Sequence, residues 1–401
     1  MRSNRMRTGL GFVATLLARG LVAGENCCNQ TVSRDVVVVG GGASGAHAAV
    51  WLRDHGHSVI VVEKASQLLK GGHTAFYHDP VTNKSINVGV QAWMEYKDTF
   101  DFPKRMNVST SGSMQFTTLN YNYVDFKTGQ PVKDWVAPAS DAMYPALQRY
   151  LNVLEKYENI TLPGFGNFPE AGSIPEDLIM PFGDFVEKYD IAAAVPQIWD
   201  STAMGLGDTM DVPTIFVTQA SGVPMVRALL GTAAAATPAS GRLYELYESV
   251  AKFLGDDVLY SSTVDSTTQR DDEGVALKVQ GADGKLTCID AKRLLVAFEP
   301  TTESLAPFET DDTEEQVFDK FGFATVYAGI LRHPSLQISA AYSNRSPAPG
   351  SSNYTVFPLA SQSALQGHRS TWYTGAAFSA GFSTVLWEHN NVLLPRMVNG
   401  I

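Results

Sequence analysis

The sequence predicts an α/β protein in which a β-strand–helix–β-strand unit near the N-terminus is followed by a mixed, less regular region. Three observations lead to this fold class: a run of β-branched residues over 35–39, a glycine-rich turn over 40–45, and a second apolar run over 58–62. Short β-branched runs are typical of strands buried on both faces of a sheet. At 401 residues the chain is long enough for one or two domains.

A helix is expected between the two strands. Ala46, Ala49 and Val50 recur at helical spacing, and Gly56 marks the expected end of the helix. The small side chains of Ala46, Ala49 and Val50 allow this helix to lie close to a sheet. Strand, helix and strand together fit within about 30 residues, which is the size of a βαβ unit.

The glycine-rich turn has the pattern of a Rossmann-type dinucleotide site. Gly40 permits the tight turn, Gly42 lets the backbone approach a pyrophosphate, and Gly45 allows close packing of helix and strand. The second strand ends on Glu63, where a carboxylate can accept hydrogen bonds from a ribose and repels a 2′-phosphate. The spacing alone does not distinguish FAD from NAD.

Further elements are expected along the chain. Helices are predicted over 144–157 and 243–253, with an irregular region from about 95 to 240. The predicted strands lie over 258–264, 275–280, 286–289 and 293–298, with a hairpin turn at 283–284. Residues 309–315 form a polar acidic patch, and residues 345–353 have the composition of a linker.

The N-terminal residues predict entry into the secretory pathway. Residues 1–24 combine a basic start with an apolar run, as in a signal peptide. The expected location is therefore secreted, or the lumen of the endoplasmic reticulum or a vesicle. Six glycosylation sequons fit this expectation: Asn29, Asn83, Asn107, Asn159, Asn344 and Asn353. Three cysteines allow at most one disulfide, from Cys27 or Cys28 to Cys288.

Composition and motifs exclude several classes of function. A net charge of −11 without a basic cluster argues against a nucleic-acid surface. No stretch after the leader has the apolar length that a stable membrane span requires. The histidines and cysteines show no metal-ligand spacing, so no metal is expected. The sequence also contains no nucleophile-elbow motif of the kind found in α/β-hydrolases. The sequence singles out no catalytic base.

Segments beyond the glycine turn point to a family. Lys70-Gly71-Gly72-His73 and the segment 87–93, together with the βαβ unit, resemble the amine oxidase superfamily of flavoproteins. Residues 372–377 look like the last cofactor strand of that superfamily, and 383–387 look like the start of its final helix. Within it, the chain is similar to fungal FAD-dependent oxidoreductases of secondary metabolism, a group that includes β-cyclopiazonate dehydrogenase and enzymes of diterpenoid pyrone pathways.

The resemblance implies FAD as the cofactor and a set of residues that hold it. The segment around Trp93 would pass near the isoalloxazine ring, and the N–H groups at the start of the final helix would face the N1/C2 carbonyl edge of the flavin. The expected cofactor-binding residues are Gly40, Gly42, Ala43, Ser44, Gly45, Glu63, Lys64, Gly71, Gly72, His73, Val90, Gln91, Ala92, Val264, Gly375, Thr384 and Val385.

The resemblance also implies a domain organisation. The expected FAD-binding domain is discontinuous, and a mixed α+β substrate domain lies between its segments. Residues 25–95, 241–300 and 364–401 are assigned to the FAD-binding domain, and residues 96–240 and 301–363 to the substrate domain.

The expected activity is FAD-dependent oxidation of a small, largely apolar secondary metabolite such as a terpenoid or indole, with molecular oxygen as acceptor. Dehydrogenation, oxidative cyclisation and an epoxidation-linked step stay open. The alternatives are an amine oxidase, a polyunsaturated fatty-acid isomerase, or a catalytically silent flavoprotein or binding protein. The last rests on the segment from Pro300 to Gly375, which is short for this family.

Overall fold

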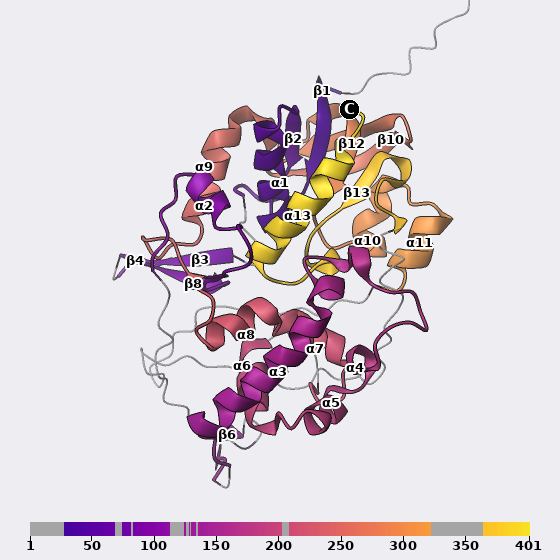
Figure 1. The fold of residues 1–401 in the computed structure, drawn as a ribbon. Coiled ribbons are helices and arrows are strands. Elements are labelled where there is room, and N and C mark those ends of the chain that lie inside the picture. Colours follow the sequence, from indigo (N-terminus) through magenta and orange to yellow (C-terminus); the bar gives the residue numbers. More distant parts are fainter. Residues whose placement is uncertain are drawn as a thin grey trace, which may run out of the picture.

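The computed structural model shows a seven-stranded sheet with helices on both faces, above a second, mainly helical region (Figure 1). It describes residues 28–68, 74–81, 83–112, 124–125, 128, 130–133, 135–202, 208–321 and 364–401. The predicted signal peptide, the predicted linker, Asn344 and Asn353 lie outside the described residues.

The sheet collects strands from three separated parts of the chain. Its order is β10-β11-β12-β1-β2-β9, and β13 pairs with β12. The parallel strands are β1 (Gln30–Val39), β2 (Val59–Val62), β9 (Val258–Leu259), β12 (Leu286–Val296) and β13 (Thr371–Tyr373). The antiparallel strands β10 (Ser262–Asp271) and β11 (Gly274–Gly281) extend the sheet beyond β12.

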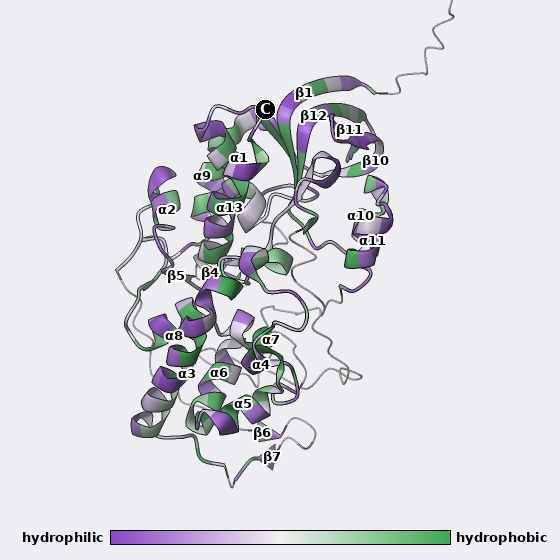
Figure 2. Cartoon of the chain, turned by 45° about the vertical axis from the view of Figure 1, so that its right-hand side comes forward, coloured by the Kyte–Doolittle hydropathy of each residue, from purple (hydrophilic) through white to green (hydrophobic). Residues whose placement is uncertain are grey.

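Alternate side chains of β1 enter two different cores, because successive residues of a strand point to opposite faces. Val36 and Val38 pack with the helices α1 (Ala43–Asp54), α9 (Glu245–Leu254) and α13 (Ser383–Met397). Val37 and Val39 pack on the other face with α10 (Thr302–Leu305), η4 (Ala306–Phe308) and α11 (Asp312–Phe318). Figure 2 shows the sheet between these two layers. All four valines are buried, which explains the unbroken β-branched run.

Strand β12 differs from the prediction. The sequence predicts two strands, over 286–289 and 293–298, but residues 286–296 form one strand of 11 residues. One edge of β12 pairs with β1 over residues 287–291 and 293–296, while the other edge pairs first with β11 and then with β13. Polar residues at its centre, such as Asp290, lie where one face of the sheet is exposed, so they do not interrupt pairing. In contrast, a turn at Tyr260 and Ser261 divides the predicted strand 258–264.

The second region is built from helices and has its own core. Helix α3 extends beyond the predicted range 144–157 and packs through Leu147, Tyr150 and Leu154. The helical elements are α2 (Asp101–Arg105), α3 (Ser140–Thr161), η1 (Phe165–Asn167), α4 (Glu176–Ile179), α5 (Phe182–Lys188), η2 (Ala192–Ala194), α6 (Val195–Thr202), α7 (Thr214–Ala220), α8 (Val223–Leu229), η3 (Gly255–Asp257), η5 (His368–Ser370) and η6 (Ala376–Phe378).

Three small antiparallel sheets complete the described elements. They pair β3 (Thr74–Asp79) with β4 (Lys84–Gly89), β5 (Trp93–Met94) with β8 (Ala235–Ala236), and β6 (Val124–Asp125) with β7 (Gln130–Pro131). The elements α10, η4 and α11, which fall within the predicted substrate domain, cover one face of the large sheet. A division at residue 300 therefore separates these helices from the sheet that they contact.

A disulfide joins Cys28 to Cys288 and attaches the start of β1 to the start of β12. The prediction of one bridge to Cys288 is confirmed, and Cys28 is the partner. Among the described residues, no helix combines the length and hydropathy needed to cross a membrane.

Replacing Cys288 by Ser is expected to lower the free energy of unfolding by about 2–5 kcal/mol, because the bridge restricts the unfolded chain. The measurement is urea unfolding followed by fluorescence. Cys28→Ser is expected to match Cys288→Ser, whereas Cys27→Ser leaves stability unchanged. A large loss in Cys27→Ser together with no loss in Cys28→Ser would contradict this pairing.

Candidate functional site

The parallel strands end at one edge of the sheet, and the residues that follow them lie side by side. Gly40 N donates to Val62 O, Glu63 N to Leu259 O, Ala297 N to Val39 O, and Thr374 N to Val296 O, each at 2.9 Å. The sheet therefore fixes the first residue after each of β1, β2, β12 and β13. This carboxyl edge is where open α/β sheets bind their ligands.

The glycine turn passes closely over the end of β12. Gly40 has a φ of +104°, and a Cβ there would lie 2.7 Å from the carbonyl oxygen of Ala297. A Cβ on Gly45 would collide with the carbonyl oxygen of Gly40. By contrast, a Cβ on Gly42 would meet no described atom within 4 Å. Gly40 and Gly45 thus permit close packing, and the backbone at Gly42 faces open space.

The start of α1 has the properties of an anion site. Gly42 is its N-cap, and among the described residues no side chain caps it. The first turn, which includes Ala43, Ser44 and Gly45, holds no acidic residue. Free N–H groups and the positive end of the helix dipole at such a start favour a phosphate.

Glu63 is held by the backbone on both sides. Its Oε2 accepts from Gly41 N at 2.6 Å, and its Oε1 accepts from Ala65 N at 2.7 Å. The side chain of Leu68 closes the other side of Gly41, which leaves no room for a Cβ there. The role of Gly41 is not among the predictions from the sequence, although the unbroken run of three glycines at 40–42 could have indicated it.

The start of β10 lies beside Glu63. Ser262 N donates to Glu63 O at 3.0 Å, and Val264 follows two residues later in β10, partly buried. Lys64 is exposed next to Glu63. The structure thus brings Val264, Glu63 and Lys64 to the same corner of the sheet. Gly71, Gly72 and His73 lie outside the described residues.

The segment before β5 meets the start of α13. Thr384 Oγ1 donates to Met94 O at 2.6 Å, and both Thr384 and Val385 are fully buried. Ala92 packs beside Met94 and Phe382. Two more of the predicted cofactor-binding residues lie in this segment. Val90 packs against the core beside α1, and Gln91 Nε2 donates to the carbonyl oxygens of Asn87 and Gly89.

A buried polar network links α1, the end of β13 and α13. Thr374 Oγ1 donates its hydrogen to Asn390 Oδ1 at 2.7 Å. Because that hydrogen is already used, the Ser44 hydroxyl is the donor in its 2.7 Å hydrogen bond with Thr374 Oγ1. Asn390 Nδ2 donates to Ser44 O at 2.8 Å and to His47 Nδ1 at 3.3 Å. Burial lowers the pKa of His47 to about 3, so the ring is neutral and can accept. Neither Asn390 nor Thr374 is exposed.

Gly375 follows this network with a φ of +116°, and a Cβ on it would meet no described atom within 4 Å. Among the described residues, the space on this side of Gly375, beside the start of α1, is therefore open, as it is at Gly42. Asn390 is not among the residues predicted from the sequence, although a polar residue on the apolar face of α13 could have indicated it.

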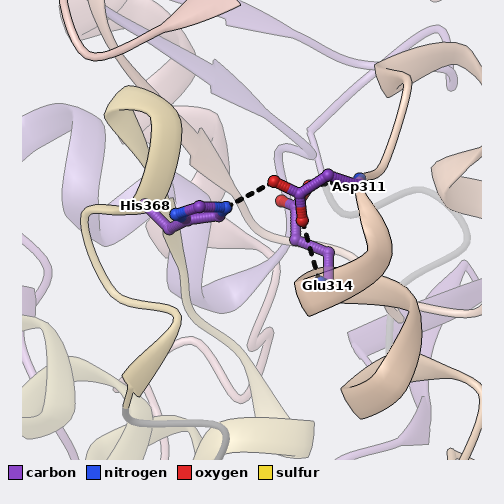
Figure 3. Close-up of side chains that lie close together, drawn as sticks. All are labelled: Asp311, Glu314 and His368. Atoms are coloured by element: carbon purple, nitrogen blue, oxygen red, sulfur yellow. Dashed lines mark hydrogen bonds and ion pairs between the residues drawn. The ribbon is translucent and has the colours of Figure 1, made fainter.

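A second network, around the buried Glu314, lies on the opposite face of the sheet, and Figure 3 shows Glu314 beside Asp311 and His368. Arg270 of β10 binds both carboxylate oxygens of Glu314 at 2.6 and 2.5 Å, and Tyr373 OH donates to the same carboxylate at 2.5 Å. Asp311 caps α11 and contacts His368 Nε2 at 2.6 Å. Burial opposes ionisation of Glu314, but the hydrogen bonds from Arg270 and Tyr373 outweigh it and hold its pKa below the ordinary value.

The three groups Asp311, Glu314 and His368 lie close enough together to hold a cation, but their bonding fits a structural role. Arg270 and Tyr373 already occupy the carboxylate of Glu314, and Arg369 lies 3.5 Å from it. Two guanidinium groups would repel a metal ion. The network instead attaches α11 and η5 to the sheet.

Asn390→Ala is expected to lower the free energy of unfolding by roughly 2–4 kcal/mol, because it leaves buried partners unpaired and opens a cavity. The matched control is Asn391→Ala on the exposed face of α13, expected within about 0.5 kcal/mol of the wild type. Chemical unfolding of both variants measures the difference, and equal stability would refute the network's role.

Glu314→Gln is expected to cost about 3–5 kcal/mol at neutral pH, because it leaves Arg270 buried without its counter-ion. The exposed neighbour variant Glu315→Gln is the control. The pKa of Glu314 is lower in the folded protein than its ordinary value of 4.5. The ionised Glu314 side chain therefore contributes its full stabilisation of the fold at pH values above 4.5, and this contribution is lost as the pH falls through the folded-state pKa. The stability gap between wild type and Glu314→Gln should therefore narrow in acid, and a gap that widens would contradict the assignment.

The described residues fit a dinucleotide. An uncapped helix start, open backbone at Gly42 and Gly375, and a carboxylate beside the turn meet at the carboxyl edge of the sheet. These groups suit a pyrophosphate and a ribose.

Comparison with protein families gives the same domain. The model of the NAD(P)-binding Rossmann-like domain matches residues 38–105. The FAD-dependent oxidoreductase oblC of Cochliobolus heterostrophus is 32% identical over 347 residues, covering 84% of this chain and 70% of that protein. The beta-cyclopiazonate dehydrogenase of Aspergillus oryzae is 34% identical over 329 residues, covering 82% and 68%. The chain thus spans about two thirds of the length of these relatives.

Solved structures show the same fold at low identity. A redesigned double mutant of putrescine oxidase superposes with a TM-score of 0.61 at 14% identity, covering 92% of this chain and 100% of that one. The CLA-producing fatty acid isomerase from P. acnes superposes with a TM-score of 0.64 at 16% identity, covering 91% and 99%. With its Rossmann-like domain and its identity to the two fungal proteins, the chain belongs to the fungal FAD-dependent oxidoreductases.

Proposed function

We propose that this flavoprotein oxidises a small, largely apolar secondary metabolite, such as a terpenoid or an indole, with molecular oxygen as the electron acceptor. The observation that carries the proposal is the assembled carboxyl edge of the sheet, in a chain 34% identical to a beta-cyclopiazonate dehydrogenase. Dehydrogenation, oxidative cyclisation and an epoxidation-linked step are the reaction types that fit this chemistry.

FAD supplies the hydride acceptor when bound, and the protein positions both cofactor and substrate. The start of α1 would hold the pyrophosphate, and Glu63 would accept hydrogen bonds from the adenosine ribose. The start of α13 has no side-chain cap among the described residues and no acidic residue in its first turn. Its positive end therefore suits the electron-rich edge of a flavin.

The side chains beside the start of α13 favour an apolar substrate. Ala92, Met94 and Phe382 pack together there, and Val385 faces the core of the helical region. Of these residues Ala92 and Phe382 are partly exposed, and a site next to them would bind a terpenoid or indole mainly by removing apolar area from water. The contact of Val385, on the first turn of α13, with the core of the helical region supports a flavin edge beside that region.

The first experiment is an absorbance spectrum of the purified full chain before and after denaturation. Bands near ~375 and ~450 nm that are released as free FAD support the proposal. A colourless protein that takes up no added FAD would overturn it and favour a silent binding protein.

The second measurement tests how FAD is held. Glu63→Gln is expected to weaken FAD binding roughly tenfold, because a charged hydrogen-bond acceptor for the ribose is lost. The exposed Glu187→Gln variant on α5 is the control. Equal FAD affinity in both variants would contradict the role of Glu63.

Oxygen uptake with terpenoid, indole, amine and fatty-acid substrates then separates the activities. Uptake with terpenoids or indoles supports the proposal, whereas uptake with amines alone indicates an amine oxidase. Conversion of a polyunsaturated fatty acid without oxygen uptake indicates an isomerase.

A further inference from the structure

Asn107 lies in a short, rigid turn after α2. Its neighbours Met106 and Val108 are both buried, at 6% and 3% exposure, so the intervening Asn107 side chain is directed outward. Its φ of +58° is a left-handed conformation that Asn tolerates better than most residues. Asn107 N donates to Lys104 O at 2.9 Å, and Val108 N donates to Pro103 O at 2.9 Å.

The turn is fixed to the rest of the fold on both sides. Before it, Arg105 of α2 forms two hydrogen bonds with Asp54 of α1, at 2.8 and 2.6 Å. After it, Ala239 N donates to Ser109 O at 2.7 Å. Because both ends are anchored, the position of Asn107 on the surface is defined by the fold.

Asn107 lines a surface groove of about 390 Å³ together with the other residues of its sequon. The residues that line the groove include the aromatic Phe100 and the long aliphatic side chain of Lys104, together with the polar residues Asp101, Ser109 and Thr110. Among the described residues, the carboxamide of Asn107 has no hydrogen-bond partner. The Nδ2 atom therefore carries a substituent without loss of any contact that the structure describes.

The disulfide is independent evidence for the compartment. Cys28 and Cys288 are bridged, and structural disulfides form and persist in oxidising environments such as the endoplasmic reticulum. Asn-linked glycosylation of Asn-x-Ser/Thr sequons belongs to secretory proteins.

We propose that the chain passes through the secretory pathway and carries an N-linked glycan on Asn107, whose inner sugars lie in the groove formed by Phe100, Lys104 and the sequon. In the transfer, a bond forms between Nδ2 and the anomeric carbon of a lipid-diphosphate-linked oligosaccharide. The anomeric C–O bond to the diphosphate breaks, the lipid diphosphate leaves, and Nδ2 releases one proton. No oxidant or reductant takes part.

The test is glycopeptide mass spectrometry of the full chain produced in a filamentous fungal host. The Asn107 peptide is expected to carry a hexosamine-based glycan. Asn107→Gln and Ser109→Ala should each remove the glycan, and Ser109→Thr should retain it. An unmodified Asn107 peptide in the wild-type protein would overturn the proposal, whatever the state of the other sequons.

The groove is tested by enzymatic deglycosylation. Release of the Asn107 glycan by an amidase should be roughly tenfold slower from the native protein than from the unfolded protein, because the seated sugars must first leave the surface. Lys104→Ser removes one wall of the groove at an exposed position and should speed native release. Equal rates for native and unfolded wild-type protein would refute the seating of the glycan.

Discussion

The buried hydrogen-bond network around Asn390 determines how the separated parts of the nucleotide-binding region fit together. It joins Ser44 at the start of α1, Thr374 at the end of β13 and Asn390 in the middle of α13. An amide has two donors and two acceptor lone pairs, and here all of its hydrogen-bonding atoms face polar partners. Buried polar groups tolerate few alternative arrangements, because a misaligned pair leaves an unsatisfied group. The network therefore fixes the registration of α13 on α1.

The adjacent residues Tyr373 and Thr374 extend this constraint through the sheet. Thr374 faces the α1 and α13 layer, whereas Tyr373 enters the opposite core and binds Glu314, which is paired with Arg270. Consecutive residues at the end of a strand point to opposite faces, so one short strand is attached on both sides. Gly375 follows directly, and its position is thus set by two buried networks.

Local patterns in the sequence predict the βαβ unit well because its determinants are local. The valines of β1 and β2, the small residues of α1 and Gly40 lie within one short segment, and each has a local physical reason. The helices α3 and α9 are likewise visible from spacing and composition, whereas the start of α13 is predicted only from the family resemblance. The sequence predicts two strands in this part of the chain, whereas the structure has a single strand, β12, in which Asp290 occupies an exposed position.

The parts that the sequence could not reveal depend on contacts between distant residues. The acidic patch 309–315 has the composition of a solvated surface, yet it holds the buried Glu314 because Arg270 lies beside it in space. Likewise, Asn390 bonds to Ser44, which is more than 300 positions away in the sequence, and to Thr374, which precedes α13 and is separated from it by a turn. Composition and spacing carry no information about such pairs, since it is the sheet that brings them together.

Glu63 shows why the site is largely formed before a ligand arrives. A buried carboxylate without a cation is costly, but two backbone N–H groups and the nearby positive start of α1 offset that cost. A carboxylate has about four lone-pair sites, and the backbone occupies two of them. The remaining lone pairs of Glu63 can accept hydrogen bonds from hydroxyl groups, such as those of a ribose, while the two hydrogen bonds from the backbone stay in place. Because Gly41 can carry no side chain between Glu63 and Leu68, this arrangement depends on the glycine turn as much as on the acid.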